Sequence, residues 1–94
     1  MESEKELIID AKDNIKPSDI EKFIYKNIAH SNIIFTAFDY EYSDDIFPSF
    51  TLGLSPKGEP DSTRVPRIAE FIDFIIQEKN MGRAISLTAK QVYV

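Results

Sequence analysis

Two segments of the chain carry apolar residues at helical spacing. In the first, Ser18-Asp19-Ile20-Glu21 matches a capping box, in which the serine hydroxyl and the glutamate satisfy free amides at a helix start. Pro17 comes just before this box and cannot continue an earlier helix. The pattern predicts a helix from about Asp19 to Ala29, with lysines on its outer side and four apolar residues on its inner face: Ile20, Phe23, Ile24 and Ile28.

The second helical segment follows a long loop over residues 55–62. It should end at Asn80-Met81-Gly82, because glycine suits the left-handed position that closes many helices. Its apolar face is wide and contains Val65, Ile68, Phe71, Ile72, Phe74, Ile75 and Ile76.

Residues 32–42 and 47–54 alternate in polarity as strands do, and Ser43-Asp44-Asp45 between them is typical of a turn. These segments predict a β-hairpin. Pro48 has no amide hydrogen, so the second strand should lie at a sheet edge or be bulged near its start. One face of the second strand should carry Phe50, Leu52 and Leu54. In the first strand we place Ile34, Phe38, Tyr40 and Tyr42 on one face, with Asp39 and Glu41 on the other.

The two ends of the chain supply the remaining candidate strands. Residues 84–94 alternate, with Ile85, Leu87 and Ala89 on one face. Residues 6–11 can be interpreted in two ways, as a strand or as a helix that uses Leu7, Ile8, Ala11 and Ile15. The paired isoleucines and the turn-forming Asp13-Asn14 favour the strand.

The resulting order of elements is β-α-β-β-α-β, which is the ferredoxin-like order. It predicts an α+β two-layer sandwich, in which two helices cover one face of a four-stranded antiparallel sheet. If residues 6–11 were helical, the order would be α-α-β-β-α-β and a different α+β sandwich would result.

Composition narrows the class of protein. The 94 residues, 43% of them hydrophobic, suit one soluble globular domain over residues 1–94, with residues 1–6 as a flexible tail. Without cysteine, disulfide scaffolds, thiol catalysis and cysteine-based zinc sites are excluded. The charged start lacks the apolar stretch of a signal peptide, and no run reaches the roughly 20 apolar residues of a membrane span. We therefore expect a cytoplasmic protein that does not bind membranes.

The net charge of −5 is unevenly distributed. Residues 1–45 hold 11 acidic residues and five lysines, whereas residues 46–94 hold five acidic and six basic residues. A phosphate backbone would be repelled by the acidic half, so direct nucleic-acid binding is not expected. The acidic residues could simply keep the protein in solution, or they could form a face that meets a basic partner.

The hairpin tip is the first candidate site. Its carboxylates could bind a divalent cation, be solvated, or face a basic protein, and tyrosine is common at protein interfaces. The sequence lacks the calcium-loop pattern, so we predict a partner-binding surface and no metal or other cofactor. Its residues are Asp39, Tyr40, Glu41, Tyr42, Asp44 and Asp45.

The start of the second helix is the other candidate site. Basic residues there oppose the helix dipole, and a bound anion would remove the conflict. Alternatively, Glu59 and Asp61 neutralise these positive charges locally. No phosphate-loop or dinucleotide-binding motif is present. The candidate anion-binding residues are Lys57, Ser62, Thr63, Arg64 and Arg67.

No catalytic motif appears in the sequence. His30 is the only histidine, and its position after the first helix suits a structural role at the carbonyl end. We therefore expect a small, acidic, non-enzymatic protein that binds another protein, of the inhibitor, immunity, antitoxin or phage-antagonist type. The alternative is a regulatory or assembly module that binds a small anion and pairs into a homodimer through edge strands. A carboxylate-based metal enzyme at the hairpin is a third option.

Overall fold

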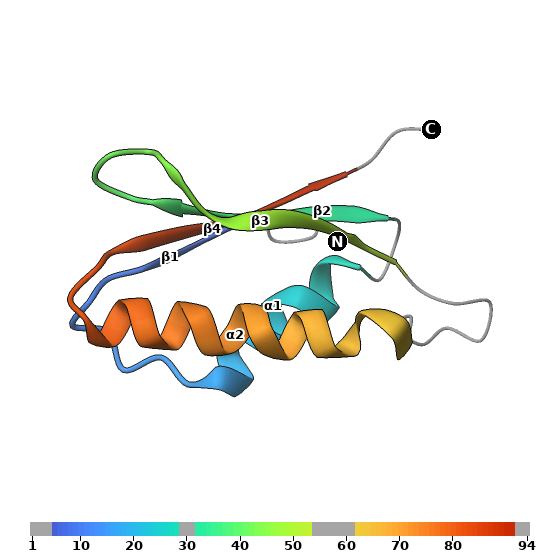
Figure 1. The fold of residues 1–94 in the computed structure, drawn as a ribbon, viewed down its shortest axis with the longest axis horizontal. Helices are drawn as coiled ribbons and strands as arrows, with labels where there is room; N and C mark the ends of the chain where they lie inside the picture. Colours follow the sequence, from blue (N-terminus) through green and yellow to red (C-terminus); the bar gives the residue numbers. More distant parts are fainter. Residues whose placement is uncertain (1–4, 29–31, 54–61, 92–94) are drawn as a thin grey trace.

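A computed structural model describes residues 5–28, 32–53 and 62–91. Along the chain it contains β1 (Glu6–Ile9), α1 (Pro17–Asn27), β2 (Ile33–Asp39), β3 (Asp45–Leu52), a 3₁₀ turn η1 (Ser62–Arg64), α2 (Val65–Asn80) and β4 (Ile85–Gln91) (Figure 1).

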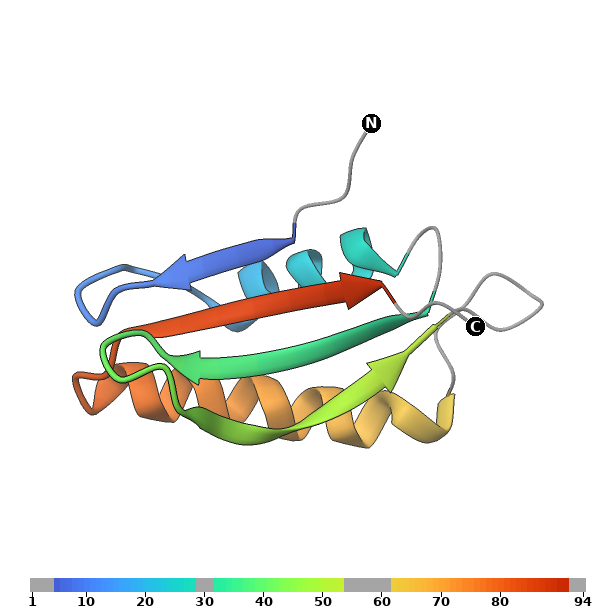
Figure 2. The ribbon, with the colours of Figure 1, turned by 90° about the horizontal axis from the view of Figure 1, so that it is seen from above.

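The strands form one antiparallel sheet in the order β1-β4-β2-β3, and both helices cover the same face (Figures 1 and 2). This arrangement confirms the α+β two-layer sandwich and the order β-α-β-β-α-β. Because β1 is a strand, the alternative with a first helix is wrong. The central strands are the second and fourth, whereas ferredoxin-like sheets have the first and third in the centre. The likeness therefore covers the order of elements along the chain and the two layers, but not the order of strands in the sheet.

The core lies between the sheet and the helices and contains a group of packed phenylalanines. Phe71 of α2 meets Phe47 and Phe50 of β3 edge-to-face, with ring centroids 5.2 and 5.1 Å apart. Phe50 stacks on Phe35 of β2 at 5.6 Å. Such pairs stabilise a core beyond the area they bury, and here they join both strands of the hairpin to α2.

The start of α1 differs from the expected capping box. The helix begins at Pro17, the first helical position, where the missing amide hydrogen costs nothing. Asp19, rather than Ser18 or Glu21, provides the cap, since its Oδ2 accepts a hydrogen bond from the Lys16 amide at 2.8 Å. The predicted pattern of buried apolar residues on this helix is confirmed.

The predicted alternation of β2 is confirmed as far as Asp39, with Ile34 and Phe38 on one face and Asp39 on the other, but the sequence did not show which face is the inner one. The side chains buried against the helices are Ile33, Phe35, Ala37 and Asp39, whereas Ile34 and Phe38 lie on the opposite, uncovered face. The strand also ends at Asp39, so the alternation does not extend to the two tyrosines. As a central strand, β2 is apolar on both faces, and polarity alone does not identify the inner one.

The two edges of the sheet test two further expectations. Pro48 lies in edge strand β3, whose pairing with β2 shifts register between Phe35 and Phe38, so an edge position and a bulge are both confirmed. At the other edge the predicted tail is too long. Glu6 belongs to β1, and the carbonyl oxygen of Lys5 accepts a hydrogen bond from the Ala89 amide at 2.9 Å.

Gly82 ends α2 as expected. Its φ of 94° is left-handed, and two hydrogen bonds close the helix, from Gly82 N to the Lys79 carbonyl and from Arg83 N to the Glu78 carbonyl. An added Cβ would meet nothing within 4 Å, so backbone conformation alone requires glycine.

Replacing Gly82 with alanine should therefore destabilise the fold by about 1 kcal/mol, which urea unfolding would measure. Gly82→Asn should cost less, because asparagine tolerates the left-handed region. Equal losses for the two variants would contradict this account.

Candidate functional site

The hairpin between β2 and β3 turns tightly over Tyr40–Asp44. The Ser43 amide donates to the Asp39 carbonyl at 2.7 Å, and the Asp39 amide donates to the Asp44 carbonyl at 2.8 Å. Ser43 has a φ of 60°, the left-handed region that a reversal of this kind requires. The backbone of the tip is thus closed by its own hydrogen bonds.

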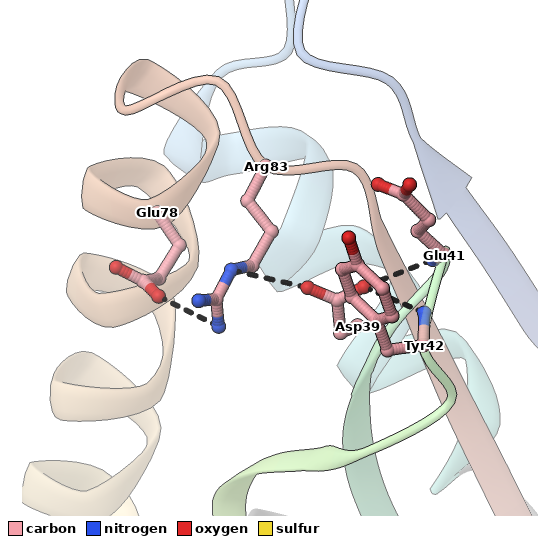
Figure 3. Close-up of polar contacts among 5 residues, drawn as sticks. All are labelled: Asp39, Glu41, Tyr42, Glu78 and Arg83. Carbon is pink, nitrogen blue, oxygen red and sulfur yellow. Dashed lines mark hydrogen bonds and ion pairs between the residues drawn. The ribbon is translucent and has the colours of Figure 1, made fainter.

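The Asp39 side chain holds the turn from inside. Its Oδ1 accepts hydrogen bonds from the amides of Glu41 and Tyr42, both at 2.9 Å (Figure 3). Only 8% of the residue is exposed. Hydrogen bonds to a charged carboxylate are stronger than neutral ones, and aspartate often organises turns in this way. Asp39 therefore fixes the path of the chain through the tip.

Arg83 connects this turn to the end of α2. Its Nε lies 3.3 Å from Asp39 Oδ2, and its guanidinium lies 3.0 Å from Glu78 Oε1 (Figure 3). Gly82 ends the helix, and its left-handed conformation sets the direction of the chain at the next residue. It therefore positions the backbone from which the Arg83 side chain extends. One arginine thus joins the hairpin to the helix, and its charge offsets part of the negative charge of the two carboxylates.

The other residues of the predicted surface are exposed. Tyr40 and Tyr42 are 56% and 69% exposed, which is unusual for large aromatic side chains. Glu41, Asp44 and Asp45 are also exposed. Five of the six predicted partner-binding residues therefore lie on the surface around one turn, whereas Asp39 is buried beneath it and supports it.

A shallow groove of about 360 Å³ extends from the tip across the uncovered face of the sheet. The helices lie on the other side (Figure 1). Half-buried Phe38 lines the groove, and Glu6 lies at its edge, where its Oε2 accepts a hydrogen bond from Ser86 Oγ at 3.2 Å. The groove thus combines an apolar surface with negative charge. Its lining residues are Glu6, Phe38, Asp39, Tyr40, Ser43, Ser86 and Thr88.

The predicted anion-binding residues are described only in part. Arg64 lies exposed in η1, beside Thr63, and no acidic residue lies in the first turn of α2. Arg67 approaches Glu70, with 3.4 Å between their side chains, and its guanidinium lies 5.5 Å from the centre of the Phe47 ring. Arg67 therefore has protein contacts that the sequence did not predict. Several residues named in the sequence analysis lie outside the described residues, namely Lys57, Glu59, Asp61, His30 and Leu54. The side chain of Ser62 is also not described.

The metal option receives no support from the geometry. Within residues 5–28, 32–53 and 62–91, no three metal-ligating side chains lie close enough together to hold an ion. The Asp39 carboxylate already accepts hydrogen bonds from two turn amides and pairs with Arg83. In the same residues, no helix has the length and apolar character needed to cross a bilayer.

The sequence indicated the residues of the hairpin tip, but not the contact between Asp39 and Arg83 that lies beneath it. Arg83 could not be predicted as part of the site, because a lone arginine after a helix matches no motif. Its pairing with Asp39 depends on β4 lying beside β2. Comparisons with protein-family models, with curated proteins and with solved structures found no match. Inference about function therefore rests on the geometry of the tip and the groove.

Proposed function

We propose that this chain is a small, non-enzymatic protein that acts by binding another protein through its hairpin tip. The observation that carries the proposal is the exposure of Tyr40 and Tyr42 on a turn held from beneath by Asp39 and Arg83. Inhibitors, immunity proteins, antitoxins and phage antagonists can all act at this size, because an interface needs only about 800 Å² per partner.

The internal hydrogen bonds favour binding because they order the turn in advance. Association is opposed by the entropy lost when loops and side chains become fixed. Here the turn backbone is already closed, and Asp39 already bonds two of its amides. Tyrosine adds a large contact area with few rotatable bonds. The tip should therefore lose little further freedom on binding.

The charges specify the chemistry of the partner. Glu41, Asp44 and Asp45 surround the tyrosines, and Glu6 lies beside the groove. A lysine or arginine of the partner could lie against the aromatic rings while pairing with a carboxylate. Rim charges of this kind mainly accelerate association and select partners. We therefore propose a partner with a basic surface.

A pull-down with the tagged protein from its native cells tests the proposal. The unmodified chain should capture a stoichiometric partner, which is then purified for affinity measurements. Tyr42→Ala should weaken the affinity about tenfold or more, as truncating an interface aromatic often does. Glu41→Gln with Asp45→Asn should slow association and reduce its dependence on salt.

A matched control separates this surface from overall charge. Glu21→Gln with Asp73→Asn removes the same two acid types from exposed helix positions and should leave the affinity unchanged. A partner bound equally well by the hairpin variants would contradict the proposed surface.

The anion-binding module is the alternative function. It is favoured by the basic residues Arg64 and Arg67 at a helix start that has no acidic residue in its first turn. If no partner is captured and phosphate raises the melting temperature, this alternative would replace the first proposal.

A further inference from the structure

The two edges of the sheet differ in how they resist pairing with another strand. Exposed edges are usually protected by proline, bulges or charges. The β3 edge has two of these devices, Pro48 and the shifts in register opposite Phe35–Phe38. The β1 edge has neither, since its four residues contain no proline and pair with β4 in regular register, and Glu6 is the only charged residue among them; Ile8 is 46% exposed. This edge is therefore the one suited to pairing.

The backbone groups that β1 presents can be identified. The Ala89 amide donates to the Lys5 carbonyl, and Lys5 and Ala89 continue the register in which Leu7 lies opposite Leu87. In an antiparallel ladder, alternate residues direct their hydrogen-bonding groups to the same neighbour. Lys5, Leu7 and Ile9 therefore bond to β4, while the amides and carbonyls of Glu6 and Ile8 point away from the sheet.

A groove of about 560 Å³ lies beside this edge, between β1 and α1. Leu7, Ile15 and Phe23 give it apolar walls. Its charges are ordered along its length, because Asp19 lies in the first turn of α1 and Lys26 in the last, with Lys22 between them. The acidic end lies near the start of α1 and the basic end near its close.

We propose that a second copy of this chain occupies this edge, and that two β1 strands pair antiparallel about a two-fold axis. The two-fold axis makes the two grooves run in opposite directions. The acidic end of each groove therefore lies beside the basic end of the other. Glu6 of one copy then exchanges backbone hydrogen bonds with Ile8 of the other, and the two Leu7 side chains meet beside the apolar groove. A shift that centres the axis on Ile8 would instead place Glu6 opposite Asp10, where like charges repel.

The proposal uses a different part of the sheet from the hairpin function, and the two share only Glu6, whose side chain lines the groove beside the tip. The dimer uses β1, whereas the hairpin turn joins β2 to β3 at the other side of the sheet (Figure 2). Both hairpin tips stay outside the strand pair, and either proposal can fail without the other.

A cysteine cross-link tests both the dimer and its register. The two Leu7 residues would form a non-hydrogen-bonded pair with Cα atoms about 4.5 Å apart, which a disulfide can span. The chain has no cysteine of its own, so Leu7→Cys should give a disulfide-linked dimer under mild oxidation. The matched control is Thr51→Cys, an exposed position on the β3 edge, which should stay largely monomeric. Sedimentation of the unmodified chain should give an average mass that rises from that of the monomer to that of the dimer as the protein concentration increases.

Three results would overturn the proposal. The first is a monomer mass for the unmodified chain at every concentration, which would leave the edge to a different protein partner. The second is cross-linking of Thr51→Cys as complete as that of Leu7→Cys. The third is a dimer that persists in Leu7→Lys, which would put two like charges at the axis, provided circular dichroism shows that this variant is folded.

Discussion

Replacing Phe71 with alanine should lower the free energy of unfolding by about 3–5 kcal/mol, a large part of the roughly 5–15 kcal/mol that stabilises a typical domain. Only 1% of Phe71 is exposed, and its ring packs against Phe47 and Phe50. Its loss would leave a cavity between α2 and β3, where its ring now packs. Urea unfolding followed by circular dichroism measures the effect.

Phe74 is the matched control on the same helix. It is half-buried, and its ring lies 5.3 Å from Phe47. Phe74→Ala should cost clearly less than Phe71→Ala, because water already reaches its site and a smaller cavity forms. Equal losses would contradict the argument that the burial of Phe71 sets the size of its contribution.

Replacing Asp39 with alanine should destabilise the protein by about 2–4 kcal/mol and release the turn. The change removes the acceptor for the Glu41 and Tyr42 amides and leaves Arg83 with Glu78 alone. Urea unfolding gives the free energy, and hydrogen exchange at the two amides reports the turn. Both amides should exchange faster in the variant.

Two further substitutions separate charge from shape. Asp39→Asn keeps an oxygen acceptor but loses the ion pair, so it should cost less than alanine and leave the amides partly protected. Asp45→Ala at an exposed position should cost little. If Asp39→Ala left amide exchange unchanged, the carboxylate would not be what orders the tip.

The sequence predicted the helices and the order of elements well, because these depend on local patterns. Apolar spacing identified both helices, and Gly82 fixed the end of α2. The inner face of β2 could not be predicted in the same way. This strand has apolar residues on both faces, and Tyr40 and Tyr42 beyond its end made the alternation seem to continue into the turn.

In the candidate site, too, the features that depend on local sequence could be predicted and those that depend on distant contacts could not. Exposed acids and tyrosines near a turn are visible in the sequence, and the structure places five of the six predicted residues there. The role of Asp39 was hidden, because an aspartate in an alternating strand is usually solvated. Its burial depends on Arg83, which arrives only when β4 pairs with β2. Contacts between distant segments of this kind have no local signature.

The central place of β4 has a consequence for the timing of folding. Among the described residues, β1 pairs with β4 alone, and the side chains of Glu6 and Ser86, which meet across these strands, lie 80 positions apart. During synthesis, β1 therefore cannot pair with β4 until Ile85–Gln91 has been made. The hairpin of β2 and β3 can form earlier. Such distant pairing slows folding. The apolar strand β1 is then open to chaperones and to aggregation for as long as the nascent chain lacks its central strand.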